Sequence, residues 1–230
     1  MDNRLQGSII IPVLNEATQI AMRLQDLRAQ MGAGWQIIVV DGGSTDDTVE
    51  QARAGCDQLV QSVRGRSTQM NAGAAVAAGE LLVFLHADTR LPVDIAVQMQ
   101  MFLQSGRQWG RFDARLDGDH PLFRMIGFMM NLRSRLTGIA TGDQVFFMRR
   151  DFFRQLNGFA PIPLMEDVEF SRRACRISRP WCSRAQVTTS ARKWQQSGIL
   201  RTMVLMWWIR LAYFVGVPPS VLHRWYYSSP

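Results

Sequence analysis

The sequence predicts an α/β protein built around a mostly parallel sheet. Three continuous apolar runs, at residues 8–13, 36–40 and 80–85, have the length and β-branched content of buried strands. Segments with helical spacing of apolar residues separate these runs. Such alternation of strand and helix is typical of a parallel sheet that helices cover on both faces.

The first half of the chain continues this alternation. Residues 16–31 repeat apolar side chains at helical spacing, and Gly32 follows as a stop signal. Thr45 or Asp46 can cap a second helix that begins near Asp47. The remaining elements predicted for this half are a short strand at 57–62 and a helix at 66–78.

The second half is less regular. Residues 199–217 are the most apolar stretch of the chain, but Arg201 and Arg210 interrupt it. We therefore expect an amphipathic helix there rather than a membrane span. The other elements predicted for this half are strands at 109–116 and 145–148 and helices at 121–136, 151–156 and 165–174.

The composition is that of a globular protein with an uneven charge. The chain has 230 residues, of which 47% are hydrophobic and 20% charged, so it can bury a core and is too apolar for disorder. Residues 1–100 carry 7 Arg against 11 Asp and Glu, a net of −4, whereas residues 101–230 carry 19 Lys and Arg against 8 Asp and Glu, a net of +11. This excess indicates either an anionic partner (nucleic acid, a phosphorylated substrate or a membrane surface) or a simple preference for Arg.

The cysteines and the N-terminus favour a cytoplasmic protein. The three cysteines, Cys56, Cys175 and Cys182, are odd in number and form no C-x-x-C pair, so neither a disulfide framework nor a zinc site is expected. The first apolar run is short and contains Pro12, which does not fit a signal peptide.

Polar and acidic residues follow the predicted strands. Asp41 comes directly after the second run, Asp88 follows the third, and Asn15 and Glu16 follow the first. Ligands bind beyond the carboxyl ends of strands in open parallel sheets. One Asp in such a place is usually a turn or cap residue, but three such positions in one alternating pattern favour a binding site.

Two further groups can carry chemistry. His86 and Asp88 are two residues apart and would point to the same side of an extended segment. Asp88 suits Mg²⁺ or Mn²⁺ on a diphosphate, while His86 is either a second ligand or a packed histidine. The pair Glu166–Asp167 stands at the expected start of a helix, where it either complements the helix dipole or supplies a general base.

Together these motifs resemble glycosyltransferase family 2. The similarity covers roughly residues 6–190. It rests on four segments in order, namely 8–16 (Ser-Ile-Ile-Ile-Pro-Val-Leu-Asn-Glu), 40–46 (Val-Asp-Gly-Gly-Ser-Thr-Asp), 84–88 (Phe-Leu-His-Ala-Asp) and the Glu-Asp pair at 166–167. Segments 65–73 and 141–144, with the histidine at position 86, are similar to a small bacterial subgroup identified as arsenosugar-biosynthesis or selenodomain-associated glycosyltransferases.

The resemblance implies an inverting enzyme with a single Rossmann-like GT-A domain. That domain would cover residues 1–190, with a nucleotide-binding half at 1–100 and an acceptor half at 101–190. An amphipathic helical extension would follow at 191–230. The implied donor is a nucleoside-diphosphate sugar, with a UDP-sugar favoured, and the implied cofactor is Mn²⁺ or Mg²⁺.

The resemblance also assigns residues to roles. Asp167 would be the catalytic base, with Glu166 beside it, and Asp88 would hold the metal, with His86 as the candidate second ligand. The implied donor-binding residues are Pro12, Asn15, Glu16, Asp41, Arg66, Gln69 and Asp88, of which Asp41 would contact the uracil or ribose. The implied acceptor-side residues are Gly142, Asp143 and Gln144. The usual D-x-D is His86-x-Asp88 here, and no Gln-x-x-Arg-Trp motif is present, so a processive polysaccharide synthase is not expected.

Two other functions fit parts of the pattern. A nucleotidyltransferase also combines a Rossmann-like half with a metal, but its Gly-rich phosphate loop is a poor match to the loop at 12–16. A non-catalytic nucleic-acid-binding module would suit the basic half, but Asp41, Asp88 and Asp167 would repel phosphates without a metal. The sequence does not identify the acceptor. A lipophilic acceptor, contact with the inner face of the cell membrane and a homodimer all suit the apolar, Arg-edged segments at 121–136 and 199–217.

Overall fold

The computed structural model describes residues 6–32 and 34–228. The first half of the chain alternates strand and helix as expected. Its elements are β1 (Gly7–Val13), α1 (Ile20–Met31), β2 (Trp35–Asp41), α2 (Thr48–Arg53), β3 (Gln58–Gln61), α3 (Arg66–Val76), β4 (Leu81–Phe84) and α4 (Ile95–Gln104). The second half contains β5 (Trp109–Leu116), α5 (Pro121–Thr137), the 3₁₀ turn η1 (Gly142–Gln144), β6 (Phe146–Arg149), α6 (Arg150–Gln155), α7 (Glu166–Cys175), β7 (Trp181–Thr189), α8 (Arg192–Ser197), α9 (Ile199–Phe214) and α10 (Pro219–Ser228).

One seven-stranded sheet organises the molecule, in the order β3-β2-β1-β4-β6-β5-β7. The pairs β1–β2, β1–β4, β2–β3 and β5–β7 are parallel, and β6 runs antiparallel to both of its neighbours. The predicted α/β fold with a mostly parallel sheet is therefore confirmed. The carboxyl ends of β1, β2 and β4 lie side by side, so the residues that follow them share one edge of the sheet.

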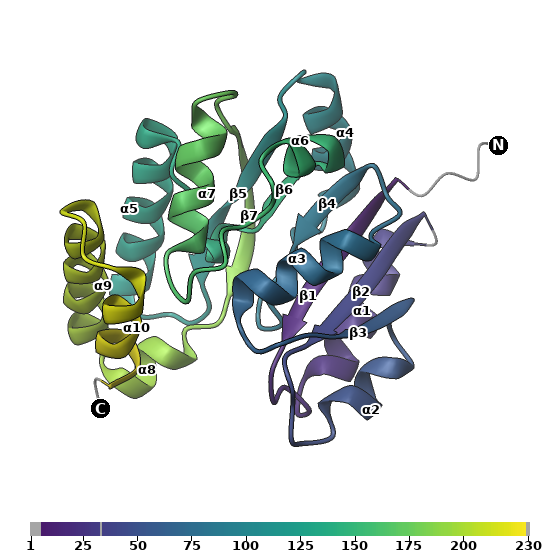
Figure 1. The fold of residues 1–230 in the computed structure, drawn as a ribbon, viewed down its shortest axis with the longest axis horizontal. Helices are drawn as coiled ribbons and strands as arrows, with labels where there is room; N and C mark the ends of the chain where they lie inside the picture. Colours follow the sequence, from purple (N-terminus) through teal and green to yellow (C-terminus); the bar gives the residue numbers. More distant parts are fainter. Residues whose placement is uncertain (1–5, 33, 229–230) are drawn as a thin grey trace.

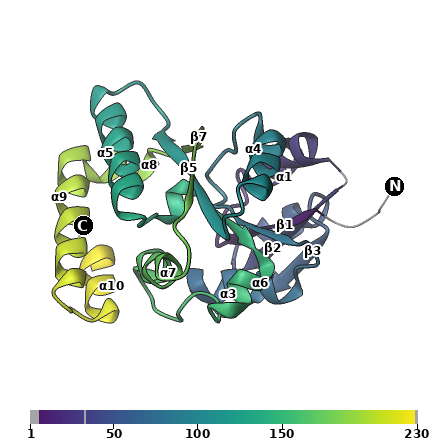
Figure 2. The same ribbon diagram turned by 90° about the horizontal axis from the view of Figure 1, so that it is seen from above.

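Helices cover both faces of this sheet (Figure 2). Ile9 and Ile11 of β1 join the core under α1 and α4, whereas Ile10 joins the core under α3, α6 and α7. Successive strand residues point to opposite faces, so a strand buried on both sides reads as a continuous apolar run. This geometry explains why β1, β2 and β4 could be predicted from apolar runs alone.

Some elements differ from the expectation. The first helix begins at Ile20 rather than at residue 16, because residues 16–19 form a turn in which the Gln19 amide donates to the Glu16 carbonyl. The helix α4 and the edge strand β7 were not anticipated. The C-terminal segment forms α8, α9 and α10, which lie beside α5 and α7 on the side of the molecule away from the N-terminus (Figure 1).

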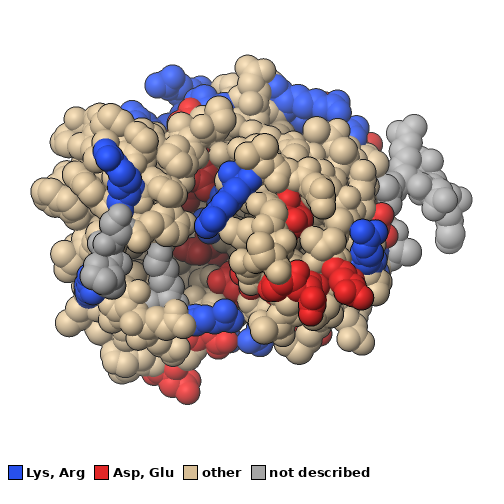
Figure 3. Space-filling view, turned by 60° about the horizontal axis from the view of Figure 1, so that its bottom comes forward, with Lys and Arg blue, Asp and Glu red and all other residues tan. Residues whose placement is uncertain are grey.

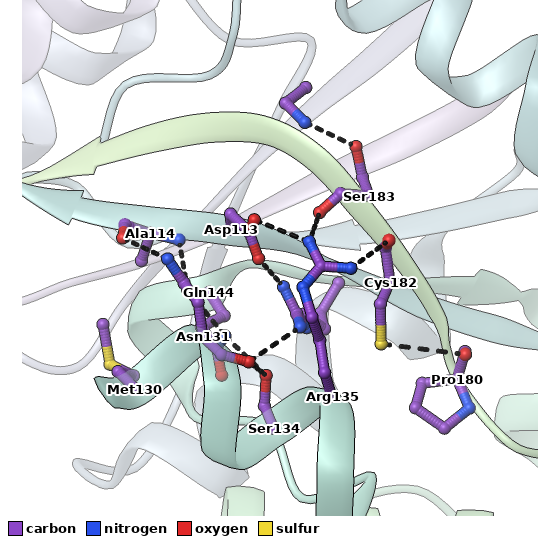
Figure 4. Close-up of polar contacts among 12 residues, drawn as sticks. Asp113, Ala114, Met130, Asn131, Ser134, Arg135, Gln144, Pro180, Cys182 and Ser183 are labelled. Carbon is purple, nitrogen blue, oxygen red and sulfur yellow. Dashed lines mark hydrogen bonds and ion pairs between the residues drawn. The ribbon is translucent and has the colours of Figure 1, made fainter. Parts of the chain in front are cut away.

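A buried network of polar side chains ties α5 to the sheet (Figure 4). Arg111 of β5 is fully buried and pairs with Asp113, whose other carboxylate oxygen accepts from Arg135 of α5 at 2.6 Å. Arg135 also donates to the backbone carbonyls of Cys182 and Ser183 in β7. One helix and two strands are thereby joined through a single aspartate.

Two further expectations from the sequence concern the cysteines and the possibility of a membrane-spanning helix. All three cysteines are free thiols, as the absence of a disulfide pattern predicted. No helix within residues 6–32 and 34–228 has both the length and the apolar character needed to span a bilayer.

Candidate active site

A cleft of about 950 Å³ opens at the carboxyl ends of the strands. It lies between the segments that follow β1 and β4 and the helices α7, α9 and α10, and Figure 3 shows acidic side chains inside this hollow with basic side chains near it. Ten of the predicted site residues line it: Pro12, Glu16, Arg66, Gln69, His86, Asp88, Gly142, Asp143, Glu166 and Asp167. The sheet edge thus brings together residues that are far apart in the sequence.

Three predicted site residues hold loops in place and are not among those that line the cleft. Asp41 is 2% exposed, and its carboxylate accepts from the backbone amides of Gly43 and Ser44. Asn15, with φ of 55°, accepts from the Thr45 amide across the neighbouring loop. These bonds fix the two loops that follow β1 and β2.

Gln144 is likewise buried. Its amide nitrogen donates to Ser134 and Asn131 of α5, and its carbonyl accepts from Thr141. Its contacts therefore anchor η1 to α5. The hydrogen-bonding groups of this side chain are thus used within the fold, and its contact with an acceptor stays a prediction.

Gln69 joins the ends of two strands. Its side-chain nitrogen donates to the carbonyls of Val13 and Val40, each at 2.9 Å. Val13 is the last residue of β1, and Val40 is the residue before the last in β2. The side chain is buried and packs under Gly42, where a Cβ atom would lie 2.9 Å from the amide. Gln69 thus shapes the base of the cleft, and its contact with a donor stays a prediction.

His86 connects the two halves of the cleft. Its ring packs on Gly142, where an added Cβ would lie 2.5 Å from the imidazole, so only glycine fits there. Its Nδ1 is 4.0 Å from the Asp143 carboxylate. Burial and the nearby Arg66 charge lower the pKa of His86 well below 6.5, so the ring is neutral at pH 7. A neutral imidazole is the form that binds metals.

Asp88 and Asp143 converge on the same part of the cleft. Asp143 is 48% exposed, and the walls of the cleft surround its carboxyl group. This enclosure raises the pKa of Asp143, and the charges of Asp88 and Asp167 raise it further, whereas Arg66 lowers it. Three carboxyl groups close enough to interact in this way favour a bound cation.

A divalent cation fits this donor set only together with a ligand. No group of three or more His, Cys, Asp or Glu side chains forms a ready metal centre in the described part of the chain. Mg²⁺ commonly takes one or two carboxylates from the protein and completes its shell with phosphate oxygens and water. Asp88, with His86 beside it, is suited to such a shared site.

The acidic pair stands at the first turn of α7. Met165, at the cap position, has φ of 68°, a left-handed conformation that is uncommon for a residue with a side chain. Asp167 accepts from the backbone amides of Gly142 at 2.9 Å and of Val168 at 2.7 Å. These two bonds hold its carboxylate at the junction of η1 and α7.

Glu166 differs from its neighbour in environment. It is 6% exposed, and burial, followed by the charge of Asp167, raises its pKa to about 7. Arg66 opposes this shift. The side chain of Arg66 is exposed, and the cleft walls around it reduce its solvation, but the carboxylates of Glu166 and Asp143 outweigh that effect and raise its pKa.

The C-terminal helices contribute residues that no motif indicated. Ile209 and Ala212 of α9 pack with Met165 and Val168 of α7, which seats α9 against the acidic pair. The residues added to the cleft in this way are Trp194, Thr202, Met206, Ile209, Arg210, His223, Tyr226 and Tyr227. Because they lie far from the recognisable motifs, only their apolar and basic composition signalled them.

Comparison with known proteins identifies the family. Residues 8–157 match the model of glycosyl transferase family 2. The chain belongs to this family. An uncharacterized glycosyltransferase of Mycobacterium tuberculosis is 30% identical over 186 residues, covering 75% of this chain and 70% of that protein. This membership confirms the family that the sequence motifs resemble.

Other relatives match this chain over shorter stretches. A PGL/p-HBAD biosynthesis glycosyltransferase of Mycobacterium bovis is 35% identical over 91 residues, which cover 36% of each chain. The match thus spans about a third of that relative.

Solved structures show the same fold. Staphylococcus aureus TarS (residues 1–349) matches with a TM-score of 0.65 and 20% identity, covering 80% of this chain and 60% of that one. The mannosyltransferase PcManGT of Pyrobaculum calidifontis, in complex with GDP-Man and Mn²⁺, matches with a TM-score of 0.64 and 20% identity, covering 80% and 56%. The GT-A architecture expected from the sequence is thereby confirmed.

Proposed function

We propose that this family 2 glycosyltransferase moves a sugar from a nucleoside-diphosphate sugar to an acceptor hydroxyl, with inversion at the anomeric carbon. The observation that carries the proposal is the meeting of Asp88 and Asp167 in one cleft, the first at the end of β4 and the second at the start of α7. Structural neighbours in complex with UDP or with GDP-Man and Mn²⁺ support the donor class. A UDP-sugar is the favoured donor.

The chain's own residues account for the displacement. Asp167, fixed by the amides of Gly142 and Val168, accepts the proton of the acceptor hydroxyl as that oxygen forms a bond to the anomeric carbon. The bond from this carbon to the diphosphate breaks, and its electron pair leaves with the nucleoside diphosphate. Arg66, which lines the cleft, offsets the developing negative charge. A single displacement without a covalent enzyme intermediate inverts the configuration.

Mn²⁺ or Mg²⁺ would be held by Asp88, with His86 as a neutral nitrogen ligand. Such an ion stabilises the charge of the departing diphosphate. Glu166 is too buried and too easily protonated near pH 7 to replace Asp88 as an anionic ligand. We assign Glu166 to shaping the charge around Asp167.

We also propose that the outer face of α5 and α9 contacts an anionic membrane surface. This outer face is defined by exposed apolar residues, namely Met125, Phe128, Met129, Leu132 and Leu136 of α5 and Leu200, Val204, Trp207, Trp208, Leu211 and Phe214 of α9. Helix α9 differs from the amphipathic helix expected at residues 199–217, because both its inner and its outer face are apolar. Indole side chains suit a membrane interface, since each is apolar with one polar N–H.

Charge favours lipid over a second copy of the chain at this face. Residues 170–230 carry ten Lys and Arg and no Asp or Glu. A homodimer through this segment would bring like charges together, whereas anionic headgroups would neutralise them. We place the enzyme at the cytoplasmic face of the membrane, consistent with its free thiols. Its relation to the arsenosugar or selenodomain subgroup, and its division at residues 100 and 190, stay predictions.

Replacement of the base tests this mechanism. We expect Asp167→Asn to bind UDP and Mn²⁺ normally but to lose turnover by at least about 100-fold, the scale of general-base catalysis. Glu166→Gln is the matched comparison, because it removes the adjacent carboxylate. A normal rate in Asp167→Asn together with a lost rate in Glu166→Gln would exchange the roles of the two residues.

A further inference from the structure

Two arginines from the second half of the chain stand near the proposed base. Arg210 of α9 lines the cleft, and the packing of Ile209 and Ala212 against α7 fixes its position. Arg133 of α5 lies close enough that Arg210 and Asp167 both act on it electrostatically. Two positive charges from different helices thus approach the same end of the cleft.

These arginines lack the partners that buried cations usually have. Nε and Nη2 of Arg133 and Nε of Arg210 are buried without a hydrogen-bond partner, and only Nη1 of Arg133 donates, to the Ile139 carbonyl. Within residues 6–32 and 34–228, neither side chain forms an ion pair. Arg133 and Arg210 are partly buried, whereas Arg111 is fully buried; its Nε also lacks a partner, but its guanidinium pairs with Asp113.

The two arginines repel each other. Burial, then repulsion from Arg210, lowers the pKa of Arg133 to about 10, and the charge of Asp167 opposes this shift. Removing a charge from water costs free energy that an opposite charge or hydrogen bonds offset. An anion placed at Arg210 would reduce the repulsion between the two arginines.

Apolar side chains adjoin Arg210. Ile209 and Tyr226 share one apolar cluster, and Met206 precedes Arg210 by one turn of α9 and lines the cleft with it. Burial, then the neighbouring Tyr227, raises the pKa of Tyr226 to about 12, so this phenol is neutral. A ligand that fits here combines an anionic group with an apolar body.

We propose that Arg210, with Arg133 behind it, binds a carboxylate or phosphate group of the acceptor, and that the acceptor is an amphiphile whose apolar part lies along the wall formed by Met206, Ile209 and Tyr226. This inference rests on the proposed function, because only that function makes the bound amphiphile an acceptor. Both arginines belong to the second half of the chain, whereas Arg66, which the proposed function assigns to the diphosphate, begins α3 in the first half. The acceptor hydroxyl would then meet Asp167 while the anionic group is held beside it.

Small amphiphiles test this subsite without turnover. Binding of hexyl phosphate, hexanoate and hexan-1-ol to the full chain is measured by calorimetry, with UDP plus Mn²⁺ titrated separately. We expect at least one of the two anions to bind at least about tenfold more tightly than the alcohol, and Arg210→Gln to abolish that preference. Which anion binds more tightly identifies the preferred group. Arg133→Gln should reduce the affinity for the anion less than Arg210→Gln does, because Nε and Nη2 of Arg133 are buried.

Matched controls keep the test sharp. Arg201→Gln, an exposed arginine on the same α9, and Arg124→Gln, an exposed arginine on α5, should leave the preference unchanged. Arg210→Lys, which retains the charge, should keep part of it, and a thermal unfolding scan shows that each variant is folded. The subsite is overturned if the wild type shows no preference for the anions, or if Arg210→Gln keeps it. It is also overturned if Arg210→Gln weakens UDP and Mn²⁺ binding instead. Loss of donor hydrolysis in a protein that still prefers the anions would count against the glycosyltransferase mechanism alone.

Discussion

At the scale of residues, the acidic pair at the start of α7 combines two carboxyl groups with different environments. Asp167 accepts two backbone N–H bonds at the cleft, whereas Glu166 is buried beside it. The same dipeptide in the sequence gives no sign of this difference, because it arises from η1, which meets Asp167, and from the packing that covers Glu166. The local pattern predicted that the pair matters, and the tertiary contacts decide which member is exposed to substrate.

The raised pKa of Glu166 has a consequence for stability. The unfolded chain loses this proton near pH 4.5, but the folded protein keeps it until about pH 7. Between these values the folded state binds more protons, so its contribution to stability is full below pH 4.5 and is lost as pH rises towards 7 and above. We expect the free energy of unfolding of Glu166→Gln, relative to wild type, to rise by up to about 3 kcal/mol from pH 5 to pH 8. Urea unfolding at both pH values measures it, and equal pH dependence in the two proteins would refute the shift.

At the scale of elements, the Arg111–Asp113–Arg135 network joins α5, β5 and β7. Asp113→Ala should destabilise the protein by about 3–5 kcal/mol, because it leaves the fully buried Arg111 charge unpaired. Asp117→Ala is the matched control. Its pair with Arg90 is more than half exposed on both sides and should contribute at most about 1 kcal/mol. Denaturant unfolding of both variants checks this, and similar losses would contradict the assigned importance of the buried network.

The elements also show where sequence patterns suffice. Strands β1, β2 and β4 are buried on both faces and therefore appear as apolar runs. The edge strand β7 pairs with β5 along its length and bridges to Arg90 at Thr188. Several of its positions are exposed and polar, so it does not appear as an apolar run. In α4, by contrast, Ile95, Met99 and Phe102 recur at helical spacing, and this pattern is visible in the sequence.

At the scale of the whole molecule, the cleft is completed by a segment outside the family motifs. Ten of the residues that the motifs predicted line the cleft, six of them at strand ends, after strands or at the start of α7 and four in α3 and η1. Arg210 and Tyr226 could not be placed from sequence, because their positions depend on how α9 and α10 pack on α7. Helix α9 therefore has two roles, with an inner face at the active site and an apolar outer face.

The outer face of α5 and α9 predicts membrane association. We expect the protein to sediment with phosphatidylglycerol vesicles at low salt and less at high salt, because screening weakens the attraction of the basic segment. Trp207→Ala with Trp208→Ala should reduce binding several-fold, whereas Met22→Ala with Met101→Ala, at exposed positions elsewhere, should not. A folded monomer that binds vesicles at neither salt concentration would remove the membrane surface. A concentration-dependent dimer lost in the double tryptophan variant would assign the face to a second copy.

Donor hydrolysis tests the central claim most directly. The wild type is incubated with a panel of UDP- and GDP-sugars in the presence of Mn²⁺ or Mg²⁺, and release of nucleoside diphosphate is measured with and without EDTA. We expect at least one sugar nucleotide to be hydrolysed in a metal-dependent manner, and Asp88→Ala to fold normally while losing both this activity and metal-dependent binding of the nucleoside diphosphate. A folded wild type that binds and hydrolyses none of the panel, or an Asp88→Ala variant with unchanged metal-dependent activity, would contradict the account.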